Sequence, residues 1–161
     1  MEPLVIRPAI PADAPEIVRL IRALAAAGER PAPVIAPVTE ASVLADGFGL
    51  SPAFEVILAC RGDIAVGFAQ FYPTYAAWIG ERTVTIANLY VAPDARRGGL
   101  ARLLVREVAR AARARGAMRL ELFVEVTNPA RAFYTRLGFT EMTDIRCRLE
   151  LGGMRAIAEE S

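Results

Sequence analysis

Two arginines and two glycines stand directly before a predicted helix, in the stretch PDARRGGLARLLV at residues 93–105. Gly98 and Gly99 are costly residues with which to begin a helix, because glycine loses the most backbone freedom on ordering. A helix N-terminus exposes unpaired N–H groups and a partial positive charge, which suit a phosphate group. Glycines let an anion approach those groups, and Arg96 and Arg97 can add charge-assisted hydrogen bonds. The stretch therefore predicts a phosphate-binding loop.

Two absences from the composition exclude several kinds of chemistry. The chain has no histidine, and all 19 basic residues are arginine. Histidine-dependent triads, HExxH zinc sites and lysine Schiff bases are therefore excluded, and no metal is expected. A Walker A loop fails because it requires lysine, and the GxGxxG dinucleotide fingerprint is absent. A glycine-containing turn without a ligand stays open as the alternative interpretation of the loop.

The composition is that of an ordinary soluble globular protein. The 161 residues are 54% hydrophobic and 23% charged, with a net charge of +1. This length favours one domain, and no apolar run reaches the roughly 18 to 20 residues of a membrane span. The near-neutral charge gives no reason to expect nucleic-acid or membrane partners. Cys60 and Cys147 have no CxxC partner, so we interpret them as two buried thiols in a cytoplasmic protein.

An arginine stripe marks the predicted helix that follows the loop. Its members recur at three- to four-residue spacing: Arg102, Arg106, Arg110 and Arg113. They stand opposite apolar positions such as Leu104, as on an amphipathic helix. A nucleic-acid-binding face is one interpretation, but Glu107 interrupts the stripe and the whole chain is near neutral. A solvated helix face is therefore the favoured interpretation.

Apolar periodicity predicts both strands and helices along the chain. Predicted strands cover residues 4–9, the two arms of a hairpin at 53–75, and residues 82–93, 118–126 and 144–151. Predicted helices cover residues 11–28, a segment beginning near Thr39, and residues 98–115 and 129–138, with a proline-rich loop at 30–38. Asp13 and Thr39 are the expected N-caps of the first two helices. Adjacent strands in the middle, followed by alternating strands and helices, indicate an α/β or α+β fold with a mixed sheet.

Two motifs in this order resemble those of the GNAT N-acetyltransferase superfamily. The stretch LYVAPDARRGGLARLLV is similar to its central motif, [Q/R]xxGx[G/A], with Arg96, Gly99 and Ala101 at the three defining positions. About 30 residues later, NPARAFYTRLGF at 128–139 resembles its second motif. The resemblance implies a GNAT-like acyl-CoA N-acyltransferase fold, with a mixed, largely antiparallel sheet of six or seven strands and about four helices. It covers one domain, residues 1–151, and leaves 152–161 as a loose tail.

The resemblance implies acetyl-CoA as the co-substrate and direct attack of an amine on its thioester. A thioester is already activated, so the reaction needs positioning, polarisation of the carbonyl and the handling of two protons. An N–H near Val91 would polarise the carbonyl, and Tyr134 matches the family's general acid, which returns a proton to the departing thiolate. The implied cofactor-binding residues are Leu89, Tyr90, Val91, Arg96, Arg97, Gly98, Gly99, Leu100, Ala101, Arg102, and either Thr127 or Asn128.

The stretch GFAQFYPTYAAWIGERTVTIANLYV further resembles the diamine (spermidine/spermine-type) acetyltransferase branch. That branch commonly carries a Glu-Asp pair before this strand end, where the present chain has Ala87 and Asn88. A polycation needs carboxylates that match its charges, so a diamine acceptor is disfavoured. We expect a primary amine of a small molecule or a peptide instead. The candidate acceptor-site residues are Tyr72, Tyr75, Trp78, Asn88 and Glu121.

The general base stays unassigned at the level of sequence. Glu121 and Glu125 share one face of a predicted strand and could relay a proton through water, although solvated surface acids are the alternative. The missing base motivates a second hypothesis, a non-catalytic acyl-CoA-binding or regulatory domain on the same fold. The resemblance also makes a homodimer plausible.

Overall fold

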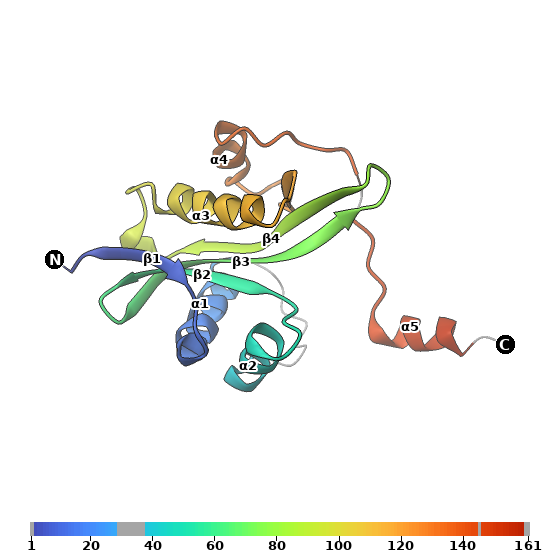
Figure 1. Ribbon diagram of the computed structural model, residues 1–161, viewed down its shortest axis with the longest axis horizontal. Coiled ribbons are helices and arrows are strands. Elements are labelled where there is room, and N and C mark those ends of the chain that lie inside the picture. Colours follow the sequence, from blue (N-terminus) through green and yellow to red (C-terminus); the bar gives the residue numbers. More distant parts are fainter. Residues whose placement is uncertain (1, 29–37, 145, 160–161) are drawn as a thin grey trace. The chain divides into compact units, whose positions relative to one another are not determined.

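The computed structural model describes residues 2–28, 38–144 and 146–159 of the chain (Figure 1). Contacts between residues divide the chain into two compact units, Met1–Phe123 and Val124–Ser161. The first unit contains the whole sheet and the predicted phosphate-binding loop, and the second contains Tyr134. The proline-rich loop predicted at 30–38 lies almost entirely outside the described residues.

Within the described residues, five strands form one sheet in the order β1-β2-β3-β4-β5. Their bounds are Leu4–Pro8, Glu55–Arg61, Ile64–Ala76, Glu81–Val91 and Arg119–Leu122. Strands β1 to β4 pair antiparallel, whereas β4 and β5 are parallel. The mixed, largely antiparallel sheet confirms the predicted fold class. The prediction of six or seven strands is wrong, because the described part of the chain forms a five-stranded sheet.

The last predicted strand, at 144–151, is not formed. Its described residues 144 and 146–150 have no regular structure and are exposed. An alternating pattern favours a strand only where a neighbouring edge supplies hydrogen bonds and one face becomes buried. Cys147, in this stretch, is therefore exposed, and the prediction that both thiols are buried holds only for Cys60.

The described residues contain five α-helices. Their bounds are Ala14–Ala27 (α1), Glu40–Phe48 (α2), Leu100–Ala114 (α3), Arg131–Arg136 (α4) and Leu151–Ala158 (α5). Short 3-10 turns, η1 and η2, occupy Pro11–Asp13 and Pro93–Ala95. Helix α5 thus occupies most of the segment for which a loose tail is predicted.

The two predicted N-caps behave differently. The Thr39 hydroxyl accepts the N–H of Ser42 at 3.1 Å, which confirms the predicted cap of α2. Asp13 stands at the N-cap position of α1, but its side chain makes no cap hydrogen bond to that helix. Its carboxylate instead accepts hydrogen bonds from both terminal nitrogens of Arg7, at 2.7 and 2.8 Å, and from the N–H of Ile10. Asp13 therefore ties the end of β1 to the start of α1.

Helices α1 and α2 cover one face of the sheet, and α3 lies along the other (Figure 1). On the first face, Ile17 and Leu20 of α1 belong to one buried cluster with Phe68 and Tyr90 of the sheet. On the second face, Gly67 lets α3 approach closely. A Cβ atom at Gly67 would lie 2.9 Å from the carbonyl oxygen of Tyr90 and 3.4 Å from the side chain of Leu104. This close packing places the N-terminal half of α3 against the end of β4.

Candidate active site

An irregularity in β4 opens one of its edges. Gln70 of β3 pairs with Asn88, and the next residue, Phe71, pairs with Ile86, so Ala87 is an extra residue in β4. Such a bulge bends a strand and interrupts its pairing. On the other side of β4, pairing with β5 covers only Thr83 to Ile86. Among the described residues, the segment 87–91 therefore continues along β3 without a β5 neighbour.

The backbone of Val91 faces this open edge. The N–H of Ala92 donates to Val66 of β3 at 2.9 Å. Consecutive residues of an antiparallel strand point their N–H and C=O groups to opposite edges. The groups of Tyr90 therefore point towards β3, and those of Leu89 and Val91 point away from it. Leu89 and Val91 can pair with an extended ligand laid along the edge, whereas Tyr90 contributes a buried ring to the core.

The loop between β4 and α3 makes two left-handed turns. Arg97 has φ of 73° and is the one described non-glycine residue with positive φ, and Gly99 has the same value. Between them, Gly98 has no such φ, and a Cβ atom there would meet nothing within 4 Å. Neither backbone conformation nor packing within the chain requires glycine at position 98. The empty space beside Gly98 is what an approaching ligand would need.

The N-terminus of α3 has unpaired donors next to this loop. Its N-cap, Gly99, has no side chain to cap the helix, and the first turn contains no acidic residue. The N–H of Leu103 donates to Gly99 at 3.1 Å, so the N–H groups of Leu100, Ala101 and Arg102 precede the regular helical pattern. Together with the helix dipole they can bind an anion. The predicted loop residues 96–102 are thus brought together, directly after the open edge of β4.

Polar side chains line the face of the sheet towards α1 and α2. Asn88 donates from Nδ2 to Oε1 of its register partner Gln70 at 2.6 Å. Thr85 of β4 is buried. It pairs with Tyr72 of β3 on one side and with Glu121 of β5 on the other. Register partners share a face, and Gln70 and Tyr72 are two residues apart on β3, so their side chains also share one. Glu121 therefore lies on the same face as Asn88. Sequence reasoning missed Gln70 and Thr85, which only the strand register connects to the candidate residues.

The predicted aromatic acceptor residues are not gathered at one place. Tyr75 is 63% exposed near the end of β3, and Trp78 is 98% exposed in the turn that follows. Along β4, about 30 Å of strand separates this turn from Val91. Tyr72 lies nearer to the open edge, beside Thr85 in the register. The described geometry therefore associates Tyr72, Asn88 and Glu121, and leaves Tyr75 and Trp78 at the far tip of the hairpin.

In the second unit, Tyr134 is packed among aromatic rings of its own segment. Its ring centroid lies 5.2 Å from that of Phe133 and 5.9 Å from that of Phe139, both in edge-to-face geometry. Burial raises the pKa of the Tyr134 phenol. The hydroxyl therefore stays protonated at neutral pH, which is the form a proton donor requires.

The two candidates for the cofactor arm differ in their local bonding. Asn128 accepts the N–H of Ala130 on its side-chain oxygen at 2.8 Å, so that oxygen already supports the start of α4. Thr127 is exposed and lies one residue earlier. Arg131 holds the same turn by donating to the carbonyl of Val126 at 2.6 Å and to Glu141.

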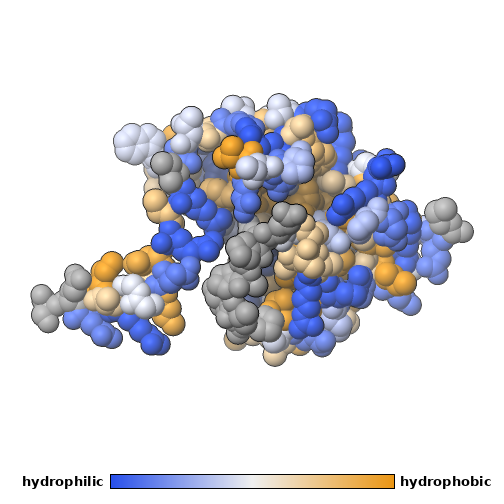
Figure 2. Space-filling model, turned by 180° about the vertical axis from the view of Figure 1, so that it is seen from behind, coloured by the Kyte–Doolittle hydropathy of each residue, from blue (hydrophilic) through white to orange (hydrophobic). Residues whose placement is uncertain are grey.

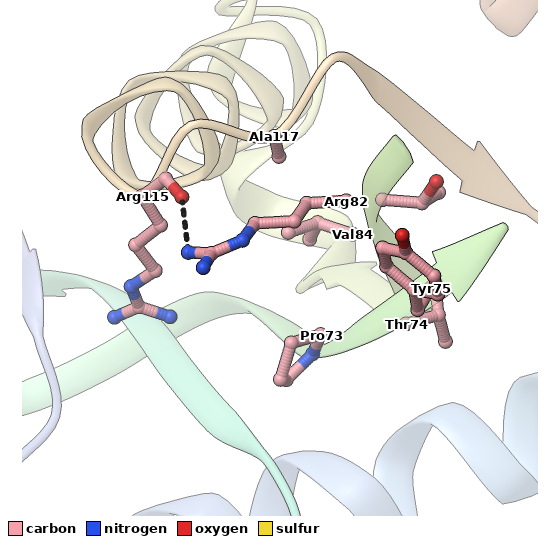
Figure 3. Close-up of a pocket in the computed structure, with 8 residues that line it drawn as sticks. Pro73, Thr74, Tyr75, Arg82, Val84, Arg115 and Ala117 are labelled. Carbon is pink, nitrogen blue, oxygen red and sulfur yellow. Dashed lines mark hydrogen bonds between the residues drawn. The ribbon is translucent and has the colours of Figure 1, made fainter. Parts of the chain in front are cut away.

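A cavity of about 490 Å³ lies at the opposite end of α3 (Figure 3). Pro73 and Val84 line it from the hairpin, and Ala117 lines it from the turn after α3. Arg82 crosses it and donates to the carbonyl of Arg115 at 3.2 Å. This contact satisfies a carbonyl at the C-terminal end of α3. The cavity is thus separate from the N-terminal end of α3, where the phosphate site is predicted.

In the first unit, the edge of β4 beyond its pairing with β5 leads to a helix N-terminus that no side chain caps. A sequence model of the acetyltransferase (GNAT) family matches residues 22–139, and the chain belongs to that family. It is an acetyl-CoA-dependent N-acetyltransferase, which transfers an acetyl group to an amine. The comparisons support this activity over a non-catalytic acyl-CoA-binding domain.

Curated relatives include a thialysine N-epsilon-acetyltransferase of Bos taurus, which is 31% identical over an alignment of 168 positions that covers 96% of this chain and 97% of the relative. A spermidine/spermine N(1)-acetyltransferase-like protein of Homo sapiens is 38% identical over 93 residues, covering 53% of this chain and 13% of that protein. These relatives confirm the predicted similarity to the diamine branch. Among solved structures, an integron cassette protein from the mobile metagenome of V. cholerae has the same fold. It has a TM-score of 0.79, 22% identity and 98% coverage of both chains.

Within residues 2–28, 38–144 and 146–159, no helix has the length and hydrophobicity needed to cross a membrane. The same residues contain no cluster of three or more side chains that could hold a metal ion.

Proposed function

We propose that acetyl-CoA lies along the Leu89–Val91 edge with its pyrophosphate on the loop 97–102. The continuity of these two features supports this placement, because the open edge leads directly into the unpaired donors of α3. The N–H of Val91 would then donate to the thioester carbonyl and stabilise negative charge as the amine attacks. Leu89 would pair with the pantetheine arm, and the side chains of Arg97 and Arg102 would add positive charge near the phosphates.

We further propose that the acceptor amine approaches from the face that carries Tyr72, Asn88 and Glu121. Glu121 is the acidic residue that the strand register associates with this face, so it can attract an ammonium group and accept its proton through water. The amine lone pair then attacks the carbonyl carbon, and the carbon–sulfur bond breaks. Tyr134 would protonate the departing thiolate, and the phenolate would regain its proton from solvent.

The relatives favour an acceptor with a side-chain amine of the thialysine type. The neutral Asn88–Gln70 pair offers no carboxylate to a second ammonium group, which supports an acceptor whose second ammonium is balanced by its own carboxylate, as in lysine and thialysine, over a diamine. A panel of amines with acetyl-CoA, monitored by thiol release, tests the assignment. It should contain thialysine, lysine, diamines, amino acids and N-terminal peptides. Turnover with thialysine or lysine that exceeds turnover with diamines is expected, and strong preference for diamines would contradict it.

Assembly as a homodimer is a second part of the proposal. Helix α5 carries three exposed apolar side chains at helical spacing, Leu151, Met154 and Ile157. Figure 2 shows hydrophobic surface on one face of the molecule. An exposed apolar stripe of this kind usually marks an interface, and a second copy of the chain is the occupant we propose. Light scattering should give twice the chain mass, and Met154→Glu should give one chain mass. We also propose that residues 1–151 form a single catalytic domain and that the protein is cytoplasmic.

A further inference from the structure

The side chain of Arg96 turns away from the phosphate loop and back to the strand that precedes it. Its Nε donates to the carbonyl oxygen of Val91 at 2.9 Å, across the η2 turn. Its guanidinium carbon lies 5.9 Å from the centre of the Tyr90 ring, which is buried. Arg96 therefore bonds to the last residue of β4 through one particular nitrogen atom.

We propose that Arg96 is a positioning residue, and that its Nε hydrogen bond, rather than its charge, is what acetyl transfer requires. This inference rests on the proposed function of the Val91 edge and the loop 97–102. The Val91 edge would bind the thioester and the loop would bind the pyrophosphate, so the distance between the edge and the loop must match the length of the pantetheine arm. The bond from Arg96 to Val91 joins the residue immediately before the loop to the last residue of the edge.

The same bond limits where the cofactor can pair. The N–H and C=O groups of Val91 both face the open edge, and Arg96 already occupies the C=O group. An extended arm can then use the groups of Leu89 and the N–H of Val91, whereas pairing at the Val91 carbonyl would have to compete with Arg96. Arg96 thereby sets the register of the arm, which places the thioester carbonyl at the Val91 N–H.

The identity of the donor atom separates this role from phosphate binding. A glutamine side chain carries its amide nitrogen at the same place in the chain of atoms as the Nε of arginine, and it has no charge. A lysine side chain keeps the charge but has a carbon atom at that place. Arg96→Gln can therefore preserve the bond to Val91, whereas Arg96→Lys cannot.

The test compares Arg96→Gln, Arg96→Lys and Arg96→Ala with the wild type, using acetyl-CoA and the best amine of the panel. We expect Arg96→Gln to retain kcat within about threefold, and the lysine and alanine variants to lose about tenfold, the effect of one lost hydrogen bond to a charged donor. Calorimetric affinity for CoA should differ between the glutamine and lysine variants by less than about threefold. Arg106→Gln, on the exposed face of α3, is the matched control and should behave as wild type.

Retention of activity by Arg96→Lys with loss in Arg96→Gln would overturn the proposal, because charge would then be the required property. Equal activity of all three variants would also overturn it. Thermal unfolding of each variant separates these results from a folding defect, and the glutamine–lysine comparison does not depend on the alanine variant. In the cofactor-free protein, NMR should show slower hydrogen exchange at Nε of Arg96 than at Nε of the exposed Arg102. This measurement tests the contact even if the proposed cofactor placement is wrong.

Discussion

Asn88 donates a 2.6 Å hydrogen bond to its cross-strand partner Gln70, directly after the bulged residue Ala87. Two neutral amides thus satisfy one another on the face where we propose that the acceptor lies. Asn88 is half-buried, so a carboxylate at this position would be only partly screened by water. We therefore propose that acceptor preference depends on this pair of residues, which the sequence separates by 17 others.

Replacement of Asn88 by Asp is expected to shift the preference towards diamines. The amide of Gln70 can rotate and donate to the new carboxylate, so the contact between the strands is kept. The added negative charge should lower KM for spermidine several-fold. A monoamine of similar length serves as the control, and its KM should change little. The same fall in KM for both amines would show that Asn88 does not sense the second cation.

Glu121→Gln should raise KM for a cationic acceptor about tenfold, because the carboxylate that attracts and deprotonates the ammonium group is removed. Steady-state kinetics from pH 6 to 9 checks this prediction, and the defect should shrink as the free amine becomes abundant at high pH. Glu107→Gln, on the outer side of α3, is the matched control. A defect that is constant over this pH range would exclude Glu121 as a base.

Gly98→Ala separates cofactor binding from folding. The added Cβ atom meets nothing within 4 Å, and Gly98 has no left-handed φ, so the melting temperature should stay within a few degrees. Acetyl-CoA affinity should nevertheless fall about tenfold or more, because the methyl group occupies the approach to the loop. Gly152→Ala is the control, since its Cβ is also unopposed. Unchanged calorimetric affinity in Gly98→Ala would contradict the phosphate assignment.

Tyr134→Phe should lower kcat about 100-fold and leave the affinity for acetyl-CoA within about twofold. The raised pKa keeps the phenol protonated, so the ratio of wild-type to variant kcat should be constant from pH 7 to 9. Phe133→Leu controls for loss of aromatic packing and should affect stability more than kcat. Equal kcat in wild type and Tyr134→Phe would remove Tyr134 from the mechanism.

The ion pair of Glu16 and Arg19 should make folding sensitive to acid. Glu16 accepts two hydrogen bonds from Arg19, and the N–H of Ala65 donates to it at 2.8 Å. The hydrogen bonds from Arg19 lower the pKa of Glu16 most, and the hydrogen bond from Ala65 lowers it further. Its stabilisation is therefore present above the unfolded pKa of about 4.3 and is lost as pH falls through the lower folded value.

Glu16→Gln should accordingly reduce the free energy of unfolding by about 1 kcal/mol at pH 7. The difference from wild type should shrink below about pH 4, where the wild-type carboxyl also becomes neutral. Urea unfolding at both pH values measures it. Glu159→Gln, an exposed carboxyl after α5, should change stability little at either pH. A difference that grows in acid would mean that the sign of the linkage is wrong.

Much of the candidate cofactor site can be predicted because its signal is local. Gly98, Gly99 and the arginines beside them are consecutive residues, and the need for bare backbone at a helix start is expressed within one turn. The same holds for the Thr39 cap, which depends on a residue three positions away. Asp13 shows the limit of local signals, since its partner Arg7 belongs to another element and removes the carboxylate from the expected cap.

The sequence by itself determined the family and the co-substrate, because both depend on short local motifs, and the same motifs predict the phosphate-binding loop. Only the tertiary structure decided which groups of Leu89 and Val91 face the open edge, and that Glu121 shares a face with Asn88. It also decided that residues 146–150 form no strand in the described structure and that Trp78 stands far along β4 from Val91. The physical reason is that register, bulges and edge pairing are contacts between distant segments. A pattern within one segment carries no information on the strand beside it.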